Sequence, residues 1–293
     1  SSPDSKRSRY SLRDRSKVRK VLFEVPEWAG KNSVNTCIID SFLAVMCCAK
    51  SKDPSFSNRL NGQSDFTLAC RTFIEGSGDI EDRKDEFIRK LFKPNNYGEF
   101  DLEGDEARMI LDKAGEASRI EISSTCDLCG HQATTSNDYH YTGVKDRGMD
   151  DLLHDILTKL NRSHRCQNTE LCKNEENKKK VLRTFDTTWM IPFDLSQRKF
   201  TPDKIRSLPR AVEVTCHILD PLMSVFEVGN GTYRLRGVTL FGGAHYTAIL
   251  YDDTHWYFYD GIETPSMKVC PDIKSLVVDP VYRIKIAYYL RVL

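Results

Sequence analysis

Cys37 is in a sequence context that could make its thiol a nucleophile. Cys37 follows a polar, turn-rich run and opens the segment CIIDSFLAVM, whose apolar residues have helical spacing. This pattern predicts a helix that begins at Cys37, with Asn35 or Thr36 as its N-cap. A thiol in the first turn of a helix feels the positive end of the macrodipole, which favours the thiolate. The alternative is a cysteine that is simply buried, since free cysteine is among the most buried residue types.

A histidine and an aspartate in the C-terminal part could complete a catalytic group. Two apolar runs, 246–251 and 256–259, flank the turn sequence DDTH and predict an antiparallel hairpin. His245 precedes the first run and Asp260 follows the second, so the hairpin would bring them together. We therefore expect Asp260 to accept a hydrogen bond from the His245 imidazole. A nucleophile, a base and an acid that orients the base form the general triad pattern, which makes a purely structural histidine the weaker alternative.

Four further cysteines have the spacing of a metal site, in two pairs: Cys126 with Cys129, and Cys166 with Cys172. The first pair is a C-x2-C-G knuckle, a spacing that lets two thiolates converge on one tetrahedral ion, whereas the second, C-x5-C, is looser. Zinc is the metal that structural sulfur sites favour. His164 or His131 could replace one thiolate, and four reduced cysteines without a metal are the alternative. Because four protein ligands leave no open position, we expect one structural zinc ion and no catalytic cofactor.

Both helices and strands are expected around these residues. The region from about 37 to 120 is mainly helical in its apolar spacing, with helices expected around 66–73, around 80–91 and in GDEARMILDKAGEA, whose acidic start suits the helix dipole. MDDLLHDILTKL predicts one more helix between the cysteine pairs. From Val181 onward strand patterns dominate, including TTWMIPF, AVEVTCHIL and a hairpin around the turn GNG. The expected fold class is α+β.

Charge and hydropathy restrict the functional classes. The net charge of +1 gives the chain no overall field that would draw it to nucleic acid or a membrane. Residues 1–20 hold eight Lys/Arg against two Asp, and we expect a basic, disordered leader there, although such an arm could touch nucleic acid or an acidic partner. No run of 18 apolar residues and no signal-peptide core is visible, so we expect a soluble cytoplasmic or nuclear protein with reduced thiols. The missing initiator methionine leads us to expect an excerpt of a longer chain with further flanking domains.

In this chain order, the segments resemble the ubiquitin-specific protease (USP) family of cysteine isopeptidases. NSVNTCIIDSFLAV is similar to that family's Cys box, FGGAHYTAIL with WYFYDG to its His box and following acid, GDEARMIL to its acidic helix segment, and AYYLRVL to its closing strand. The resemblance covers about residues 22–293. It implies that Cys37 is the nucleophile, His245 the general base, Asp260 the group that orients the base, and Asn32 the side-chain donor to the oxyanion.

The resemblance also implies an architecture and a reaction. The fold would be papain-like, a single catalytic domain after the leader, with a helical thumb over about 21–120, zinc-bearing β fingers over about 121–190 and an antiparallel β palm over about 191–293. The reaction would be hydrolysis of the isopeptide bond after the C-terminal Gly-Gly of ubiquitin on protein conjugates. A monomer is expected, with ubiquitin or a ubiquitin-like modifier as partner and neither membrane nor nucleic acid.

Several positions depart from the family pattern. Asp40 stands where most members have Asn; there, and in the knuckle C-x2-C-G-H-Q, the chain is similar to the divergent USP-like SUMO isopeptidase branch. Ser33, Val34, Ala244 and Gly261 also differ from the usual residues. Ubiquitin is favoured over SUMO because N-T-C and G-A-H-Y follow the larger family. Two alternatives come from other classes: a catalytically silent modifier-binding scaffold, which need not keep all three triad residues, and a zinc-ribbon nucleic-acid module, which would bind with strong salt dependence.

Overall fold

The computed structural model describes residues 23–27, 33–138, 166, 168, 170, 172, 181–194, 225–228, 231–270 and 283–292. Helices and strands are mixed in them, which confirms the predicted α+β class. The helical segments are α1 (Cys37–Lys52), η2 (Phe56–Arg59), α2 (Asp65–Glu75), α3 (Ile80–Leu91), η3 (Ala107–Leu111), α4 (Asp112–Ala114) and η4 (Gly115–Ser118). The leader, MDDLLHDILTKL and AVEVTCHIL lie outside the described residues. Among the described helices, none is long and apolar enough to cross a membrane.

The strands form one large sheet, one three-stranded sheet and a short parallel pair. Their bounds are β1 (Ser33–Val34), β2 (Phe100–Asp101), β3 (Arg119–Cys126), β4 (Gln132–Asp138), β5 (Val181–Thr187), β6 (Met190–Asp194), β7 (Val225–Val228), β8 (Gly231–Gly242), β9 (His245–Tyr251), β10 (Trp256–Tyr259), β11 (Met267–Cys270) and β12 (Arg283–Arg291). The large sheet has the order β11-β10-β9-β8-β12-β6, with β7 paired to β8. Every pairing in this sheet is antiparallel, and β12 near the C-terminus joins β8 to the distant strand β6.

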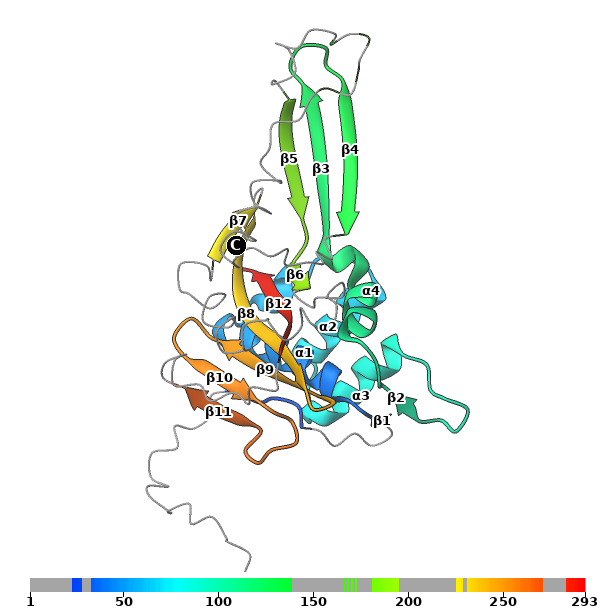
Figure 1. The fold of residues 1–293 in the computed structure, drawn as a ribbon, viewed down its shortest axis with the longest axis vertical. Coiled ribbons are helices and arrows are strands. Elements are labelled where there is room, and N and C mark those ends of the chain that lie inside the picture. Colours follow the sequence, from blue (N-terminus) through cyan, green and yellow to red (C-terminus); the bar gives the residue numbers. More distant parts are fainter. Residues whose placement is uncertain are drawn as a thin grey trace, which may run out of the picture.

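Helix α1 is the centre of the core. Every residue from 38 to 49 in it is buried, as expected for a helix covered on all sides. The helix lies against β8 and β9 (Figure 1). Gly237 of β8 permits this approach, because a Cβ atom there would lie 2.5 Å from Cγ2 of Val45. Phe42 contacts the rings of Phe66 from α2 and Tyr288 from β12, with centroids 5.6 and 5.4 Å apart. Helix and sheet therefore share one apolar core.

The segment GDEARMILDKAGEA forms the short pieces η3, α4 and η4 in place of one regular helix. Its acidic residue Glu106 does not serve the helix dipole at the surface, contrary to the expectation, but is completely buried. The Glu106 carboxyl accepts hydrogen bonds from the hydroxyls of Thr239 and Tyr288, both at 2.7 Å. Burial raises the pKa of Glu106 to about 8. This carboxyl thus joins the helical region to β8 and β12.

The three-stranded sheet, in the order β4-β3-β5, stands away from the rest of the molecule (Figure 1). Its central strand β3 carries a polar run from Ser123 to Thr125, whose side chains are half-buried or exposed. Because those positions add no apolar core, the outer end of this sheet needs another source of stability. Cys126, the last residue of β3, lies at that end.

Candidate active site and metal centre

Cys37 is the first residue of α1, and its side chain is half-buried. The chain reaches it from β1, after which Asn35 takes a left-handed conformation with φ of 58°. The side-chain amide of Asn35 donates to Asp101 Oδ1 at 2.9 Å and so holds this bend against β2. Thr36 occupies the predicted N-cap position but does not cap the helix with its side chain. Its hydroxyl instead donates to Asp40 Oδ2 at 2.6 Å.

His245 and Asp260 meet at one end of the β9–β10 hairpin. The strands are paired as far as Ala248 and Tyr259, so Asp260 directly follows the last pair and His245 lies three residues before it. His245 Nε2 and Asp260 Oδ1 are 2.8 Å apart, so the hydrogen bond expected from the hairpin is present. The backbone N–H of Ile262 donates to the same oxygen at 3.1 Å and fixes the carboxylate. Because this bond occupies Nε2, Nδ1 is the ring nitrogen that could exchange a proton with a nucleophile.

A tight turn sets the direction of His245. Gly242 pairs with His245, so only Gly243 and Ala244 connect β8 to β9. Both have positive φ, 61° and 62°, as a type I′ hairpin turn requires. Ala244 takes the left-handed conformation at a steric cost that glycine would not carry. The departure of Ala244 from the family pattern, noted in the sequence, therefore falls on a strained position.

The starts of α1 and β9 meet at the Cys37 thiol. Burial raises the pKa of this thiol, and a backbone hydrogen bond from Tyr246, the residue after His245, opposes the rise. The Asp40 carboxylate adds to the rise. The N–H groups of Cys37 and Ile38 at the helix start lower the pKa, in the direction that the sequence predicts, but desolvation outweighs them. Within the described part of the chain, no hydrogen bond joins the thiol to the His245 ring.

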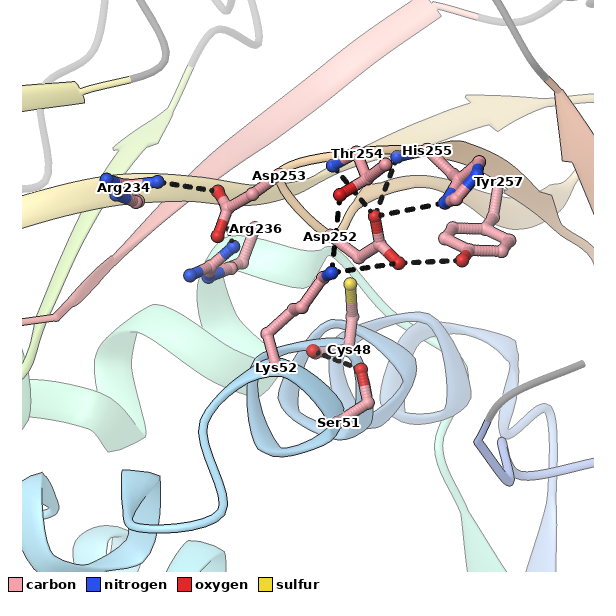
Figure 2. Close-up of polar contacts among 10 residues, drawn as sticks. All are labelled: Cys48, Ser51, Lys52, Arg234, Arg236, Asp252, Asp253, Thr254, His255 and Tyr257. Atoms are coloured by element: carbon pink, nitrogen blue, oxygen red, sulfur yellow. Dashed lines mark hydrogen bonds and ion pairs between the residues drawn. The ribbon is translucent and has the colours of Figure 1, made fainter.

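The far end of the same helix and hairpin carries a second polar group (Figure 2). Asp252 Oδ1 accepts from the backbone N–H groups of Thr254 and His255, at 2.9 and 2.7 Å. The Tyr257 hydroxyl donates to Oδ2 at 2.8 Å, and Lys52 Nζ lies 3.9 Å from the same oxygen. Burial opposes ionisation of Asp252, but the N–H groups, the hydroxyl and the lysine hold its pKa below the ordinary value.

The next residue fastens this turn to β8. Asp253 has a φ of 73°, and its Oδ1 lies 3.1 Å from Arg234 and 2.9 Å from the buried Arg236. Helix α1 therefore has its last residue, Lys52, beside the β9–β10 turn (Figure 2), while the thiol of its first residue, Cys37, accepts a backbone hydrogen bond from Tyr246 of β9. The two ends are about 22 Å apart along the helix axis. This attachment fixes the helix relative to the strands that carry His245 and Asp260.

The four predicted cysteine ligands come together at the end of the three-stranded sheet. Their sulfur atoms all lie within 4.8 Å of one another. The distance is 3.6 Å between the sulfurs of Cys126 and Cys172, and also between those of Cys129 and Cys166. These separations are too long for disulfides, which need about 2.0 Å. They match the edge of a tetrahedron of sulfurs around zinc, about 3.8 Å for a bond of about 2.3 Å. The cluster could therefore bind a metal ion.

Backbone N–H groups donate to two sulfurs of this cluster, whereas burial raises the pKa of Cys166 and hydrogen bonding with neighbouring thiols raises that of Cys172. Hydrogen bonds from the N–H groups of Cys129 and Leu128 lower the pKa of Cys126 to about 7. The N–H of Asn168 donates to Cys166 Sγ at 3.4 Å. His131 contributes its carbonyl oxygen to the knuckle, as acceptor from Cys126 N at 2.9 Å, but is not in the ligand group. Of the two histidines considered as replacements, His164 lies outside the described residues, as does the expected oxyanion donor Asn32.

Comparison with known proteins adds no relative. No family model matches the chain, and no curated protein matches it. The chemistry of the site must therefore be inferred from its own residues.

Two charged residues close to the start of α1 are buried together: Asp40, noted above only as a departure from the family pattern, and Lys84, which no sequence motif singled out. Asp40 of α1 and Lys84 of α3 are buried, with side chains 1% and 0% exposed, and form an ion pair of 3.1 Å. A pattern that could have revealed Lys84 was available: it lies at helical spacing between Ile80 and Phe87 on the apolar face of α3. Lysine at such a position must be paired or reach water.

Proposed function

We propose that this protein is a thiol-dependent isopeptidase that hydrolyses the bond after the C-terminal Gly-Gly of ubiquitin, or of a ubiquitin-like modifier, on protein conjugates. The observation that carries the proposal is the 2.8 Å hydrogen bond between His245 and Asp260, next to the Tyr246 backbone that contacts the Cys37 thiol. The backbone contact with Tyr246 supports a shared site for these residue types, which thiol catalysis requires, because it brings the start of β9 to the first turn of α1. A papain-like arrangement of thumb, fingers and palm belongs to the same proposal.

The first step follows from the ionisation of the thiol. Because burial keeps Cys37 protonated, His245 acts as a general base: its Nδ1 takes the thiol proton while Asp260 stabilises the imidazolium through Nε2. The thiolate then attacks the carbonyl carbon of the modifier's last glycine. Backbone N–H groups of the first turn of α1 and the side chain of Asn32 are the proposed donors to the oxyanion.

The remaining steps return the enzyme to its starting state. The imidazolium gives its proton to the leaving lysine amine, which breaks the isopeptide C–N bond and leaves a thioester on Cys37. A water molecule, deprotonated by His245, attacks the thioester carbonyl. The modifier leaves as a free carboxylic acid, and the proton on His245 returns to the Cys37 sulfur.

We also propose that the four-cysteine cluster holds one zinc ion as Zn(Cys)4. The support is the tetrahedral spacing of the sulfurs and the N–H groups that donate to them. Such an ion would be structural, since four protein ligands leave no position for water or substrate. It would hold the outer end of the three-stranded sheet, where the described side chains provide no apolar core.

The test uses ubiquitin and SUMO that carry a thiol-reactive group at the C-terminus, with the adduct measured by intact mass. We expect a ubiquitin adduct that is absent in Cys37→Ala. An adduct with SUMO alone would keep the isopeptidase mechanism and change the modifier. No adduct with either modifier, from folded and zinc-loaded protein, would contradict the proposal and favour the silent scaffold. Metal analysis of the same sample is expected to give one zinc per chain.

A further inference from the structure

A completely buried lysine, Lys84, is paired with Asp40 in the first turn of α1, the turn that begins with the proposed nucleophile. The ammonium of Lys84 is 3.1 Å from Asp40 Oδ1 and 2.6 Å from Glu81 Oε2, and it donates to the backbone carbonyl of Glu27. Its side chain has no exposed surface. A buried ammonium is costly unless charges and acceptors surround it, and here two carboxylates and a carbonyl do so. The ion pair is therefore a specific arrangement, and removing one partner would leave the other charge buried.

The partners of Lys84 hold the chain on both sides of Cys37. On the upstream side, the backbone carbonyl of Glu27 accepts a hydrogen bond from Lys84. The backbone N–H of Glu27 donates to Glu81 Oε1 at 2.6 Å. On the downstream side, Asp40 lies in the first turn of α1, three residues after Cys37. Lys84 thus connects the segment that leads to the nucleophile with the turn that carries it.

Two further hydrogen bonds complete this support. The second oxygen of Asp40 accepts from the Thr36 hydroxyl at 2.6 Å, which orders the residue directly before the nucleophile. The Tyr259 hydroxyl donates to the carbonyl of Pro26 at 2.7 Å. Because Tyr259 precedes Asp260 on the chain, the upstream segment is also tied to the strand that carries the triad carboxylate.

We propose that Asp40 and Lys84 are positioning residues for Cys37, which hold the first turn of α1 in place and set the ease with which the thiol ionises. The inference rests on the proposed role of Cys37 as nucleophile. Asp40 acts through the thiol and touches no substrate: its negative charge disfavours a thiolate in the same helical turn, and Lys84 neutralises most of that charge.

The surrounding groups make this electrostatic effect testable. Those that face the thiol or the ion pair come from three elements: Tyr246 from β9, Glu81 from α3, and Tyr259 from β10. Burial raises the pKa of Asp40 to about 7 against the opposing effects of Lys84 and the Thr36 hydroxyl. The Asp40 carboxyl, with Lys84 beside it, is therefore ionised in the alkaline range in which the Cys37 thiol titrates.

The test compares Asp40→Asn, Lys84→Met and the double variant, with Glu86→Gln as control. Glu86 lies on the exposed side of α3, 55% exposed, so its change alters charge on the same helix away from the pair. The first readout is the pH dependence of Cys37 alkylation by iodoacetamide, followed by peptide mass. The second is kcat and KM for hydrolysis of a modifier conjugate by the full chain.

For Asp40→Asn, we expect the alkylation midpoint to move to lower pH, because a negative charge near the thiol is gone, while Glu86→Gln leaves it unchanged. For Lys84→Met, we expect kcat to fall about tenfold or more with KM nearly unchanged, since misplacement of a nucleophile acts on the chemical step. The double variant is expected to recover most of that loss, because no unpaired charge remains.

An unchanged midpoint in Asp40→Asn would overturn the inference, as would an equal loss of kcat in Lys84→Met and the double variant. If Lys84→Met alone does not fold, the double variant carries the test through its alkylation midpoint, which must lie above that of Asp40→Asn because the Lys84 charge is removed as well. Alkylation requires no modifier, so its outcome is separate from the proposed function. If the wild type does not hydrolyse the conjugate but Asp40→Asn still shifts the alkylation midpoint, the isopeptidase proposal fails. The proposed effect of Asp40 on the thiol then still stands.

Discussion

Each end of the β9–β10 hairpin holds an aspartate, a histidine and a cysteine of α1. One group is Cys37, His245 and Asp260, and the other is Cys48, His255 and Asp252. In the first, imidazole and carboxylate are 2.8 Å apart and form a hydrogen bond. In the second they are 3.7 Å apart, and the carboxylate oxygens are used by backbone N–H groups and a tyrosine hydroxyl (Figure 2).

The two cysteines differ even more than the carboxylates. Cys48 is fully buried, and burial raises its pKa far above the ordinary value, so it is an apolar core residue. Cys37 is half-buried, and backbone N–H groups oppose the rise of its pKa. The comparison teaches that three suitable residue types in one place do not make a catalytic group. Access to the sulfur and a carboxylate directed at the imidazole distinguish the two ends.

The two ends of the hairpin are expected to differ most when the cysteine at each end is replaced. Cys37→Ala is expected to lower hydrolysis by at least about 10⁴-fold with little change in stability, because the nucleophile is lost from a half-buried position. Cys48→Ala is expected to keep kcat and lose about 1 kcal/mol of unfolding free energy through a small cavity. Steady-state kinetics and denaturant unfolding measure both. A folded Cys48→Ala protein without turnover would contradict the distinction.

A second substitution pair tests the carboxylates. Asp260→Asn is expected to reduce kcat by about 10² to 10⁴-fold, since an amide stabilises the imidazolium poorly and can favour the wrong tautomer. Asp252→Asn, at the other end, is expected to leave kcat within about twofold. The pH–rate profile gives the supporting evidence: only Asp260→Asn should alter its shape. Equal losses in the two variants would show that the far end also supports catalysis.

The far carboxylate is expected to affect stability. Asp252→Asn removes charged hydrogen bonds, which should cost about 1 to 2 kcal/mol at pH 7. Because the folded-state pKa of Asp252 is below its ordinary value, this contribution is present above about pH 4, the unfolded pKa, and is lost as pH falls through the folded value. Thermal unfolding of both proteins from pH 7 to pH 3 should show the difference shrinking only in acid.

The smallest effect concerns the two turns. Ala244→Gly should stabilise the protein by about 0.5 to 1 kcal/mol, because glycine takes positive φ without the steric cost. Asp253→Gly also removes the steric cost of a positive φ, but it removes the carboxylate between Arg234 and Arg236 as well. We therefore expect this variant to be less stable than the wild type. Chemical denaturation of the two variants measures the signs. A stabilising Asp253→Gly would mean that those ion pairs contribute little.

Local sequence patterns determined the elements that carry the site. The start of α1 at Cys37, the hairpin between His245 and Asp260, and the ligand set of the cysteine cluster all follow from spacing. These features are predictable because a helix repeats every 3.6 residues, a hairpin aligns the ends of its strands, and a knuckle brings two sulfurs within reach of one ion.

Only the tertiary structure decided how each group ionises and what supports it. The helix-start argument gave Cys37 a lowered pKa, yet burial against β9 raises it. Likewise, the acidic start of its segment predicts Glu106 at the surface, but packing encloses Glu106, and it also encloses Lys84. Desolvation depends on every element that covers a group, and those elements come from distant parts of the chain. Spacing along the sequence therefore specifies which residues meet, while packing specifies their protonation.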